Sequence, residues 1–245
     1  MDDRTLSLLE GITQLGESAT ARMIAAACPM PQATAYRRLS ELETLGVVER
    51  SGRGFRIGGR LYRLLASGLN TETLISTVSP AAAALAEATG EVCFAARLVD
   101  IRVEIFLTES PRAATGVSVV PPLGNRPASI CSAAKAILAH LPPGLRSEIL
   151  TASAEFFHQL PARRPEDLDA DLIGVQETGI AYCIGDEDPD CASIAAPVKL
   201  SGGYGQLCLG LSGPRSRMTE KLRGELASEL RHHVERLEAS GKLNF

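Results

Sequence analysis

The first 57 residues combine three short helical patterns with two short strand patterns, and this order constrains the fold more than any other feature of the chain. Apolar residues recur at helical spacing in residues 7–15, 20–28 and 31–45. The positions expected to face a core are Leu8, Leu9, Ile12 and Leu15 in the first helix, Met23, Ile24 and Ala27 in the second, and Ala35, Leu39, Leu42 and Leu45 in the third. Three amphipathic helices of this length can bury a common core.

The ends of these helices also carry local signals. Thr20 is a good N-cap for the second helix, and Pro31 suits the first turn of the third because a proline there loses no hydrogen bond. Gly46 is expected to end the third helix. Short strands over 47–50 and 55–57 follow, joined by a turn with two glycines. Three helices and a two-stranded wing predict a winged helix-turn-helix.

Charge is distributed unevenly along the chain. Residues 1–68 contain nine arginines and seven acidic residues, a balance of +2. The remaining residues therefore carry a net charge of −6, because the net charge of the whole chain is −4. The basic residues between positions 32 and 63 are Arg37, Arg38, Arg50, Arg53, Arg56, Arg60 and Arg63. Only Glu41, Glu43 and Glu49 oppose them there. Such a cluster is typical of phosphate binding, although a solvated surface rich in arginine has the same composition.

The third helix is expected to read DNA bases, because a recognition helix enters the major groove with its N-terminal residues against base edges. The candidate readers are Gln32, Thr34, Tyr36 and Arg37. Arg37 is the strongest of them, since an arginine can donate two parallel hydrogen bonds to a guanine.

The remaining basic candidates are expected to contact the DNA backbone. Arg50, Arg53 and Arg56 lie in the wing, where they would hold phosphates or reach the minor groove. Arg38 is a DNA-binding candidate with an alternative, because it lies near the edge of the apolar stripe and its stem can cover the core instead.

The rest of the chain predicts a second domain of α+β class. Helices are expected over 80–89, 130–140, 145–157, 165–179 and 219–239, and strands over 92–98, 101–108, 180–184, 192–200 and 206–212. A hairpin would turn at Val99 and Asp100, and Ser129 is the expected cap of the helix that follows. This order of elements favours a mixed antiparallel sheet with helices packed on it.

Composition limits the cellular setting and the chemistry. With 45% hydrophobic residues the 245-residue chain can bury real cores, and no apolar run is as long as a bilayer span. The N-terminus is acidic where a secretory signal is basic, and the six cysteines form no CxxC pair. We therefore expect a cytoplasmic protein with no disulfide framework, no metal site and no cofactor.

Residues 5–68 resemble the DNA-binding domain of IclR-family bacterial transcriptional regulators, through ATARMIAAACPMPQATAYRRLSELETLGVVERSGRGFRIGGRLYRLLASG. Further on, LAEATGEVCFAARLVD, ASICSAAKAILAHL, GIAYCIGDEDPDCASIAAPV and LCLGLSGPRSRMT follow in the family's order. The resemblance implies a winged helix-turn-helix at 1–66, a linker helix at 67–80 and a GAF-like effector-binding domain at 81–245. It also implies a homodimer or homotetramer that binds a palindromic operator and responds to a small metabolite, often an organic acid.

The resemblance implies an effector site between the start of the helix after GNRPASICSA and the later strands. Free N–H groups at a helix start attract a carboxylate, and hydroxyls nearby add to this. The candidate effector-binding residues are Ser129, Cys131, Ser132, Cys183, Asp186, Ser193, Gly210 and Ser212. Each serine can equally be an ordinary capping or strand residue, and each cysteine a small buried hydrophobe.

Several positions depart from the family members that bind small oxyacids. Cys183 stands where those proteins often have an acid, Ser193 where they have a cysteine, and Gly210 where they have a serine. Ala192 replaces an arginine of the family motif, while Ser212 is retained. Because these changes remove polar partners, they favour a larger or more apolar effector over a glyoxylate-like one.

The resulting hypothesis is a ligand-responsive transcriptional regulator without catalysis of its own. It would act either as a repressor or as an activator. Two alternatives remain from the residues. One is a sensor that binds a small molecule or a protein partner but no DNA. The other is a hydrolase, for which the chain lacks a GxSxG nucleophile motif and any evident histidine base.

Overall fold

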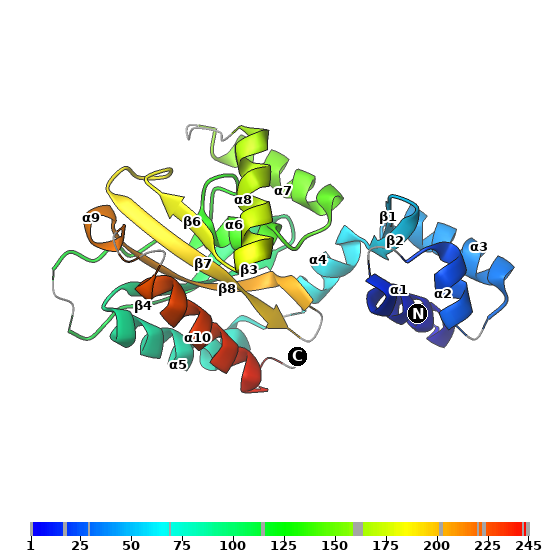
Figure 1. Ribbon diagram of the computed structural model, residues 1–245, viewed down its shortest axis with the longest axis horizontal. Helices are drawn as coiled ribbons and strands as arrows, with labels where there is room; N and C mark the ends of the chain where they lie inside the picture. Colours follow the sequence, from blue (N-terminus) through cyan, green and yellow to red (C-terminus); the bar gives the residue numbers. More distant parts are fainter. Residues whose placement is uncertain are drawn as a thin grey trace. The chain divides into compact units, whose positions relative to one another are not determined.

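The chain forms two compact units, Met1–Leu64 with Pro142–Leu145 and Leu65–Leu141 with Arg146–Phe245 (Figure 1). The structure is a computed structural model. It describes residues 2–16, 19–28, 30–68, 70–113, 116–158, 164–200, 203–219, 221, 224–241 and 243, with side chains omitted at 67 and 203–205.

The first unit is a winged helix-turn-helix. Its elements are α1 (Asp3–Leu15), α2 (Ala21–Ala27), α3 (Gln32–Thr44), β1 (Val48–Ser51) and β2 (Gly54–Ile57). The two strands pair antiparallel, with Val48 opposite Ile57 and Ser51 opposite Gly54. Gly52 in the turn has φ 55°, a left-handed conformation that favours glycine. This confirms the fold class predicted for the N-terminal domain.

Side-chain caps fix where the first two helices begin. An oxygen of Asp2 accepts a 3.0 Å hydrogen bond from the backbone N of Thr5, so α1 starts four residues earlier than its apolar stripe indicated. Thr20 caps α2 as predicted, its Oγ1 accepting from the N of Met23 at 3.3 Å. At the end of α3 the chain turns through Gly46, whose φ is 69°.

The core of this unit lies between the three helices and the wing. Its most buried members include Leu8, Ile12, Ile24, Leu39, Val48 and Phe55. Three predicted core positions are wrong, because Met23 is 41% exposed, Leu45 is 52% exposed and Ala27 is exposed as well. In α2 the inward positions belong to Ala21, Ile24 and Ala25, and Leu45 lies beyond the last turn of α3.

The second unit is an α+β domain around one sheet. Its helices are α5 (Thr71–Thr89), α6 (Ser132–Leu138), α7 (Pro143–Phe156), α8 (Pro165–Thr178), α9 (Arg215–Met218) and α10 (Glu225–Ala239), and α4 (Gly59–Ser67) leads into it. Its strands are β3 (Val92–Val99), β4 (Arg102–Glu109), β5 (Gly124–Asn125), β6 (Ala181–Ile184), β7 (Cys191–Leu200) and β8 (Gly203–Pro214). The order across the sheet is β5-β4-β3-β8-β7-β6, and neighbouring strands run antiparallel.

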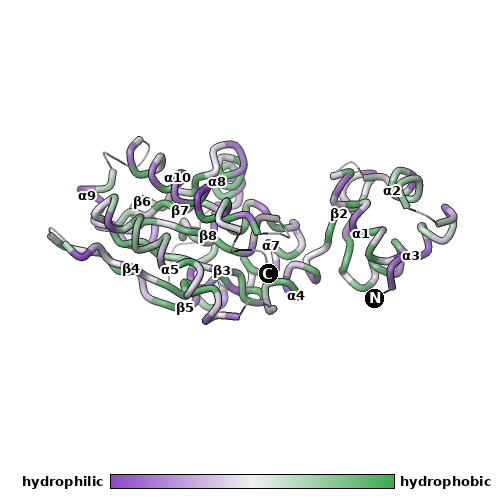
Figure 2. Tube along the Cα trace, turned by 90° about the horizontal axis from the view of Figure 1, so that it is seen from below, coloured by the Kyte–Doolittle hydropathy of each residue, from purple (hydrophilic) through white to green (hydrophobic). Residues whose placement is uncertain are grey.

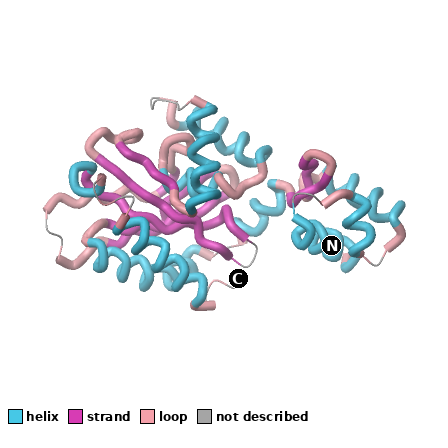
Figure 3. The backbone as a smooth tube through the Cα atoms, viewed as in Figure 1, coloured by secondary structure: helices cyan, strands magenta, loops and turns pink. Residues whose placement is uncertain are grey.

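Helices cover both faces of this sheet. On one face α5 and α10 lie side by side, against β3, β4, β7 and β8 (Figure 1). On the other face α6 packs against β3, β4, β6, β7 and β8, with α8 next to it. Figure 3 shows the strands between these two groups of helices. Residues on the α6 face are therefore enclosed between the sheet and a short helix.

Several predicted boundaries in this unit are wrong, including that of β8, which is Gly203–Pro214 and not 206–212. Helix α5 begins at Thr71, capped by Asn70, and continues through Pro80, because its buried stripe from Leu74 to Ala86 packs on both sides of the proline. Helix α6 starts at Ser132 after Cys131, so Ser129 is not its cap. The C-terminal helix starts at Glu225, and the short α9 precedes it.

Hydrophobic residues concentrate where the helices meet the sheet, and Figure 2 shows hydrophilic and hydrophobic residues alternating along the helices. On the α5 and α10 face the core includes Leu85, Ile194, Leu209, Leu211 and Leu230.

None of the helices in the described part of the chain is long and apolar enough to cross a membrane. Within the same residues, no group of three or more His, Cys, Asp or Glu side chains is arranged to hold a metal ion.

Candidate DNA interface and effector cavity

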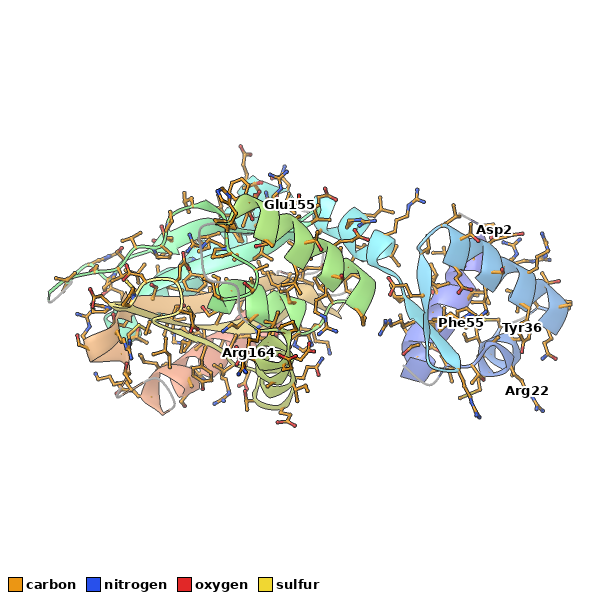
Figure 4. The ribbon with its side chains drawn as sticks, turned by 90° about the horizontal axis from the view of Figure 1, so that it is seen from above. Asp2, Arg22, Tyr36, Phe55, Glu155 and Arg164 are labelled. Carbon is orange, nitrogen blue, oxygen red and sulfur yellow. The ribbon has the colours of Figure 1, made fainter. Side chains whose placement is uncertain are left out.

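The N-terminal half of α3 presents most of its predicted base readers to solvent. Gln32 and Tyr36 are exposed, and Thr34 is partly buried. Figure 4 labels Tyr36 on α3 and Arg22 on α2. Arg22, an exposed residue in the first turn of α2, was not among the predicted DNA contacts.

The adjacent arginines of α3 have different surroundings. The side chain of Arg37 is 69% exposed, and its Nη1 lies 2.9 Å from Oε1 of Glu41 one turn later. The side chain of Arg38 is 21% exposed and donates to both carboxylate oxygens of Asp2, at 2.9 and 2.7 Å, and to Oγ1 of Thr5 at 3.0 Å. Arg37 is thus available to a ligand, whereas the contacts of Arg38 favour the structural role weighed for it above.

The wing arginines also differ in how they are held. Arg50 pairs with Oε1 of Glu43 at 3.1 Å, and its guanidinium lies 4.6 Å from the centre of the Phe55 ring. Arg56 lies 3.5 Å from Oε2 of Glu49 and is largely covered. Arg53, in the turn, is exposed. Its charge is therefore the most accessible of the three to a phosphate.

A cavity of about 210 Å³ lies in the second unit, on the α6 face of the sheet. The described residues that line it are Phe94, Ile105, Val119, Val120, Pro121, Pro122, Arg126, Cys131, Cys183, Glu187, Asp188, Cys191, Ala192, Ser193 and Ser212. That volume corresponds to roughly seven water molecules in the liquid, which suits a small molecule better than a drug-sized one. Most of the wall is apolar, with a few polar groups converging on it.

Strand register brings three predicted effector residues together. Cys183 of β6 is opposite Ser193 of β7, and Ser193 is opposite Ser212 of β8. The three therefore form one row across the sheet, and all three line the cavity. Cys131, at the start of α6, lines it as well. Residues that are 81 positions apart in sequence, from 131 to 212, meet at one site.

The other four predicted effector residues lie outside the lining. Ser132 is buried, and its Oγ is 2.7 Å from Oγ of Ser193, so it supports the wall from behind. Asp186 faces the buried Lys135, with 3.7 Å between Oδ2 and Nζ. Ser129 is partly exposed, and Gly210 is covered by the ring of Phe94. Cavity contacts by these four are not supported by the geometry.

Sequence reasoning missed the basic residue of the cavity. Arg126 is the only basic residue among the described lining residues, and its side chain is 8% exposed. It forms an ion pair with Glu187 of the loop between β6 and β7. Burial works against its charge, but Cys131 and Glu187 outweigh this and raise the pKa of the guanidinium. The single arginine in GNRPASICSA was the signal that could have pointed to it.

The cavity thiols are not activated nucleophiles. Burial raises the pKa of Cys131, and burial together with neighbouring Cys131 raises that of Cys183 to about 11. Partial burial and a hydrogen bond to Asp188 raise the pKa of Cys191 to about 11. Because a thiolate is the reactive form, these cysteines are poor candidates for covalent catalysis. The carboxylate paired with Arg126 is that of Glu187.

A winged helix-turn-helix joined to an α+β unit with a cavity is the architecture of a two-domain DNA-binding regulator. Two family models match the chain, the IclR helix-turn-helix domain at residues 3–52 and the bacterial transcriptional regulator IclR C-terminal domain at residues 66–239. The chain belongs to the IclR family of bacterial transcriptional regulators. This family is one of regulators rather than enzymes, so the hydrolase alternative falls.

Individual relatives agree with this assignment. The chain is 27% identical over 247 residues to the HTH-type transcriptional regulator BhcR of Paracoccus denitrificans, covering 99% of this chain and 85% of that protein. It shares the fold of Pseudomonas aeruginosa HmgR, with a TM-score of 0.60, 20% identity and coverage of 96% and 95%. An IclR homolog from Microbacterium hydrocarbonoxydans, solved with 4-hydroxybenzoate, has a TM-score of 0.57, 23% identity and 96% coverage of each chain.

Proposed function

We propose that this IclR-family regulator binds a palindromic operator as a homodimer or homotetramer, and that a small molecule in the cavity of the second unit alters its DNA affinity. Residues 67–80 would link the DNA-binding and effector-binding domains. The observation that carries the proposal is the separation of two sites into two compact units. One presents exposed arginines on a winged helix-turn-helix, and the other encloses a cavity.

In this proposal Arg37 reads bases together with Gln32, Thr34 and Tyr36 at the start of α3. Its 2.9 Å contact with Glu41 is an exposed pair one helical turn apart, which contributes only about 0.3–0.5 kcal/mol. A bidentate bond to guanine is worth about 1–3 kcal/mol of discrimination, so the arginine can exchange partners on binding. Arg53 would contact phosphate, with Arg50 and Arg56 at the flanks of the wing.

The effector would act by selecting one quaternary arrangement. Binding to the favoured arrangement changes the spacing of two recognition helices relative to operator half-sites. The relative solved with 4-hydroxybenzoate supports a small organic acid as the effector class, and the apolar wall of the cavity suits a ligand with an apolar body. A decisive shift of population needs roughly 5 kcal/mol of differential binding.

The test is fluorescence anisotropy of the full chain on a labelled fragment from upstream of its own gene, with a scrambled competitor and a salt series. We expect preferential binding and a slope of several units of log affinity against log salt. A control protein with Arg37→Ala should lose the preference.

If no fragment binds, sites are selected from random DNA. Failure to enrich any sequence would overturn the DNA-binding part of the proposal, and would favour the alternative of a sensor that binds a small molecule without DNA.

A further inference from the structure

The cavity contains a buried arginine whose hydrogen-bonding capacity is only partly used. The Nη2 of Arg126 donates to Oε1 of Glu187, while Nε has no hydrogen-bond partner in the described part of the chain. A guanidinium has five N–H donors, and a buried donor without an acceptor is costly. The arginine lies in the wall of the cavity, where its guanidinium is paired with Glu187.

The backbone around Arg126 is fixed independently of its side chain. Its own N donates to the carbonyl of Val103 at 2.8 Å. Two residues later, the N of Ala128 donates to Oγ of Ser153 on α7, also at 2.8 Å. The position of the Arg126 backbone therefore does not depend on which carboxylate pairs with the guanidinium.

Glu187 is anchored less firmly than its partner. Its side chain is 30% exposed, against 8% for Arg126. The loop that carries it is held through its backbone, where the N of Gly185 donates to Cys191 O at 3.0 Å and the N of Cys191 donates to Asp188 O at 3.0 Å. The carboxylate of Glu187 can therefore rotate into solvent without loss of these loop contacts.

We propose that Glu187 is a displaceable internal counterion, and that the carboxylate of a small monocarboxylate bound in the cavity replaces that of Glu187 on Arg126. The inference rests on the proposed function, because it assigns ligand chemistry to the same cavity. The exchange is favourable because Arg126 stays paired throughout, while Glu187 regains water.

The rest of the lining restricts the ligand further. Phe94, Ile105 and Val119 offer an apolar surface for the body of the ligand. Asp188, the second acid of the lining, would repel a second negative charge. The volume of about 210 Å³ limits the body to the size of a single small ring or short chain.

The test is thermal unfolding of the full chain without DNA, with sodium formate, acetate, benzoate and 4-hydroxybenzoate as probes at constant ionic strength. Benzamide and benzylamine hydrochloride are the neutral and cationic counterparts of benzoate. Ligands that bind only the folded state raise the melting temperature. We expect benzoate to stabilise the native protein by several degrees, and benzamide and benzylamine to have no effect.

Substitutions identify the two partners. Glu187→Gln should lower the melting temperature without ligand, and carboxylates should then restore it, with an apparent affinity at least tenfold above that of the native protein. Glu187→Asp, a milder change, should give an intermediate response. Arg126→Met should abolish the response.

The matched control is Glu91→Gln, which breaks a different ion pair of the second unit, one in which the acid and not the arginine is buried. Glu91 is 4% exposed and is held by Arg217 at 2.6 and 2.7 Å, away from the cavity lining. This variant should lose stability but respond to benzoate as the native protein does.

Three results would overturn the inference. They are carboxylate responses that survive in Arg126→Met, responses to benzylamine larger than those to benzoate, and the absence of any rise in the melting temperature of Glu187→Gln with all four carboxylates.

The anisotropy assay distinguishes this inference from the proposed function. If carboxylates bind through Arg126 but leave operator affinity unchanged, the inference stands and the proposed control of DNA binding by these ligands is wrong. If another compound alters operator affinity while carboxylates do not bind, the proposed effector control stands and this inference is wrong.

Discussion

The ring of Phe94 occupies the space that a side chain at Gly210 would need. An ideal Cβ on Gly210 would lie 2.3 Å from Cζ of Phe94 and 2.5 Å from the carbonyl oxygen of Ile194. The two residues are register partners on β3 and β8, so the ring lies across this strand pair. Where the family resemblance implied a serine hydroxyl, the cavity has an aromatic wall.

We therefore expect Gly210→Ala to destabilise the second unit by about 1–3 kcal/mol, because the added methyl meets both a ring and a backbone atom. Gly174→Ala in α8 is the control, since an added Cβ there has no atom within 4 Å. Alanine in a helix interior should stabilise by about 0.5–1 kcal/mol. Urea unfolding measures both, and equal effects of the two substitutions would contradict the packing described.

Arg37 and Arg53 should affect DNA binding differently. Arg37→Ala should remove the preference of operator over scrambled DNA by about 1–3 kcal/mol. Arg53→Ala should weaken binding to both DNAs alike and reduce the salt slope by about 1. Anisotropy titrations at four salt concentrations distinguish these outcomes. Arg164→Ala, an exposed arginine of the second unit, serves as the control. A uniform loss in Arg37→Ala would show that this residue contacts phosphate instead.

Asp2 should titrate well below an ordinary aspartate. A hydrogen bond from the Thr5 hydroxyl, followed by those from Arg38 and the Thr5 backbone, lowers its pKa from 3.8 to about 2. Because this pKa is depressed in the folded state, its stabilising contribution is present above pH 3.8 and is lost as the pH falls through about 2. Carboxyl NMR should show that Thr5→Val and Arg38→Gln each raise the pKa of Asp2 towards 3.8. A value near 3.8 in the native protein would refute the arrangement.

Cys191 should resist alkylation despite its partial exposure. With the pKa raised to about 11 by partial burial and then by Asp188, only about one thiol in a thousand is ionised at pH 8. Asp188→Asn should lower the pKa and accelerate iodoacetamide labelling at least severalfold, as followed by peptide mass spectrometry. Rapid labelling of the native residue at pH 8 would be inconsistent with these surroundings.

The sequence by itself determined most of the local elements. Helical spacing, the Thr20 cap and Gly46 predicted the winged helix-turn-helix, because capping and amphipathicity depend on residues within a few positions of each other. The same kind of signal failed at Pro80. A proline normally marks a boundary, but packing of the residues on both sides keeps α5 continuous there.

The tertiary structure decided which side chains meet. It gave the adjacent Arg37 and Arg38 different surroundings, because Asp2 and Thr5, which are distant in sequence, form hydrogen bonds with Arg38 only. It also paired Arg126 with Glu187, 61 positions away, and placed Phe94 over Gly210. These contacts depend on strand register and on how the helices pack, which residue type and spacing along one segment do not specify. The candidate ligand chemistry therefore became visible only in the folded chain.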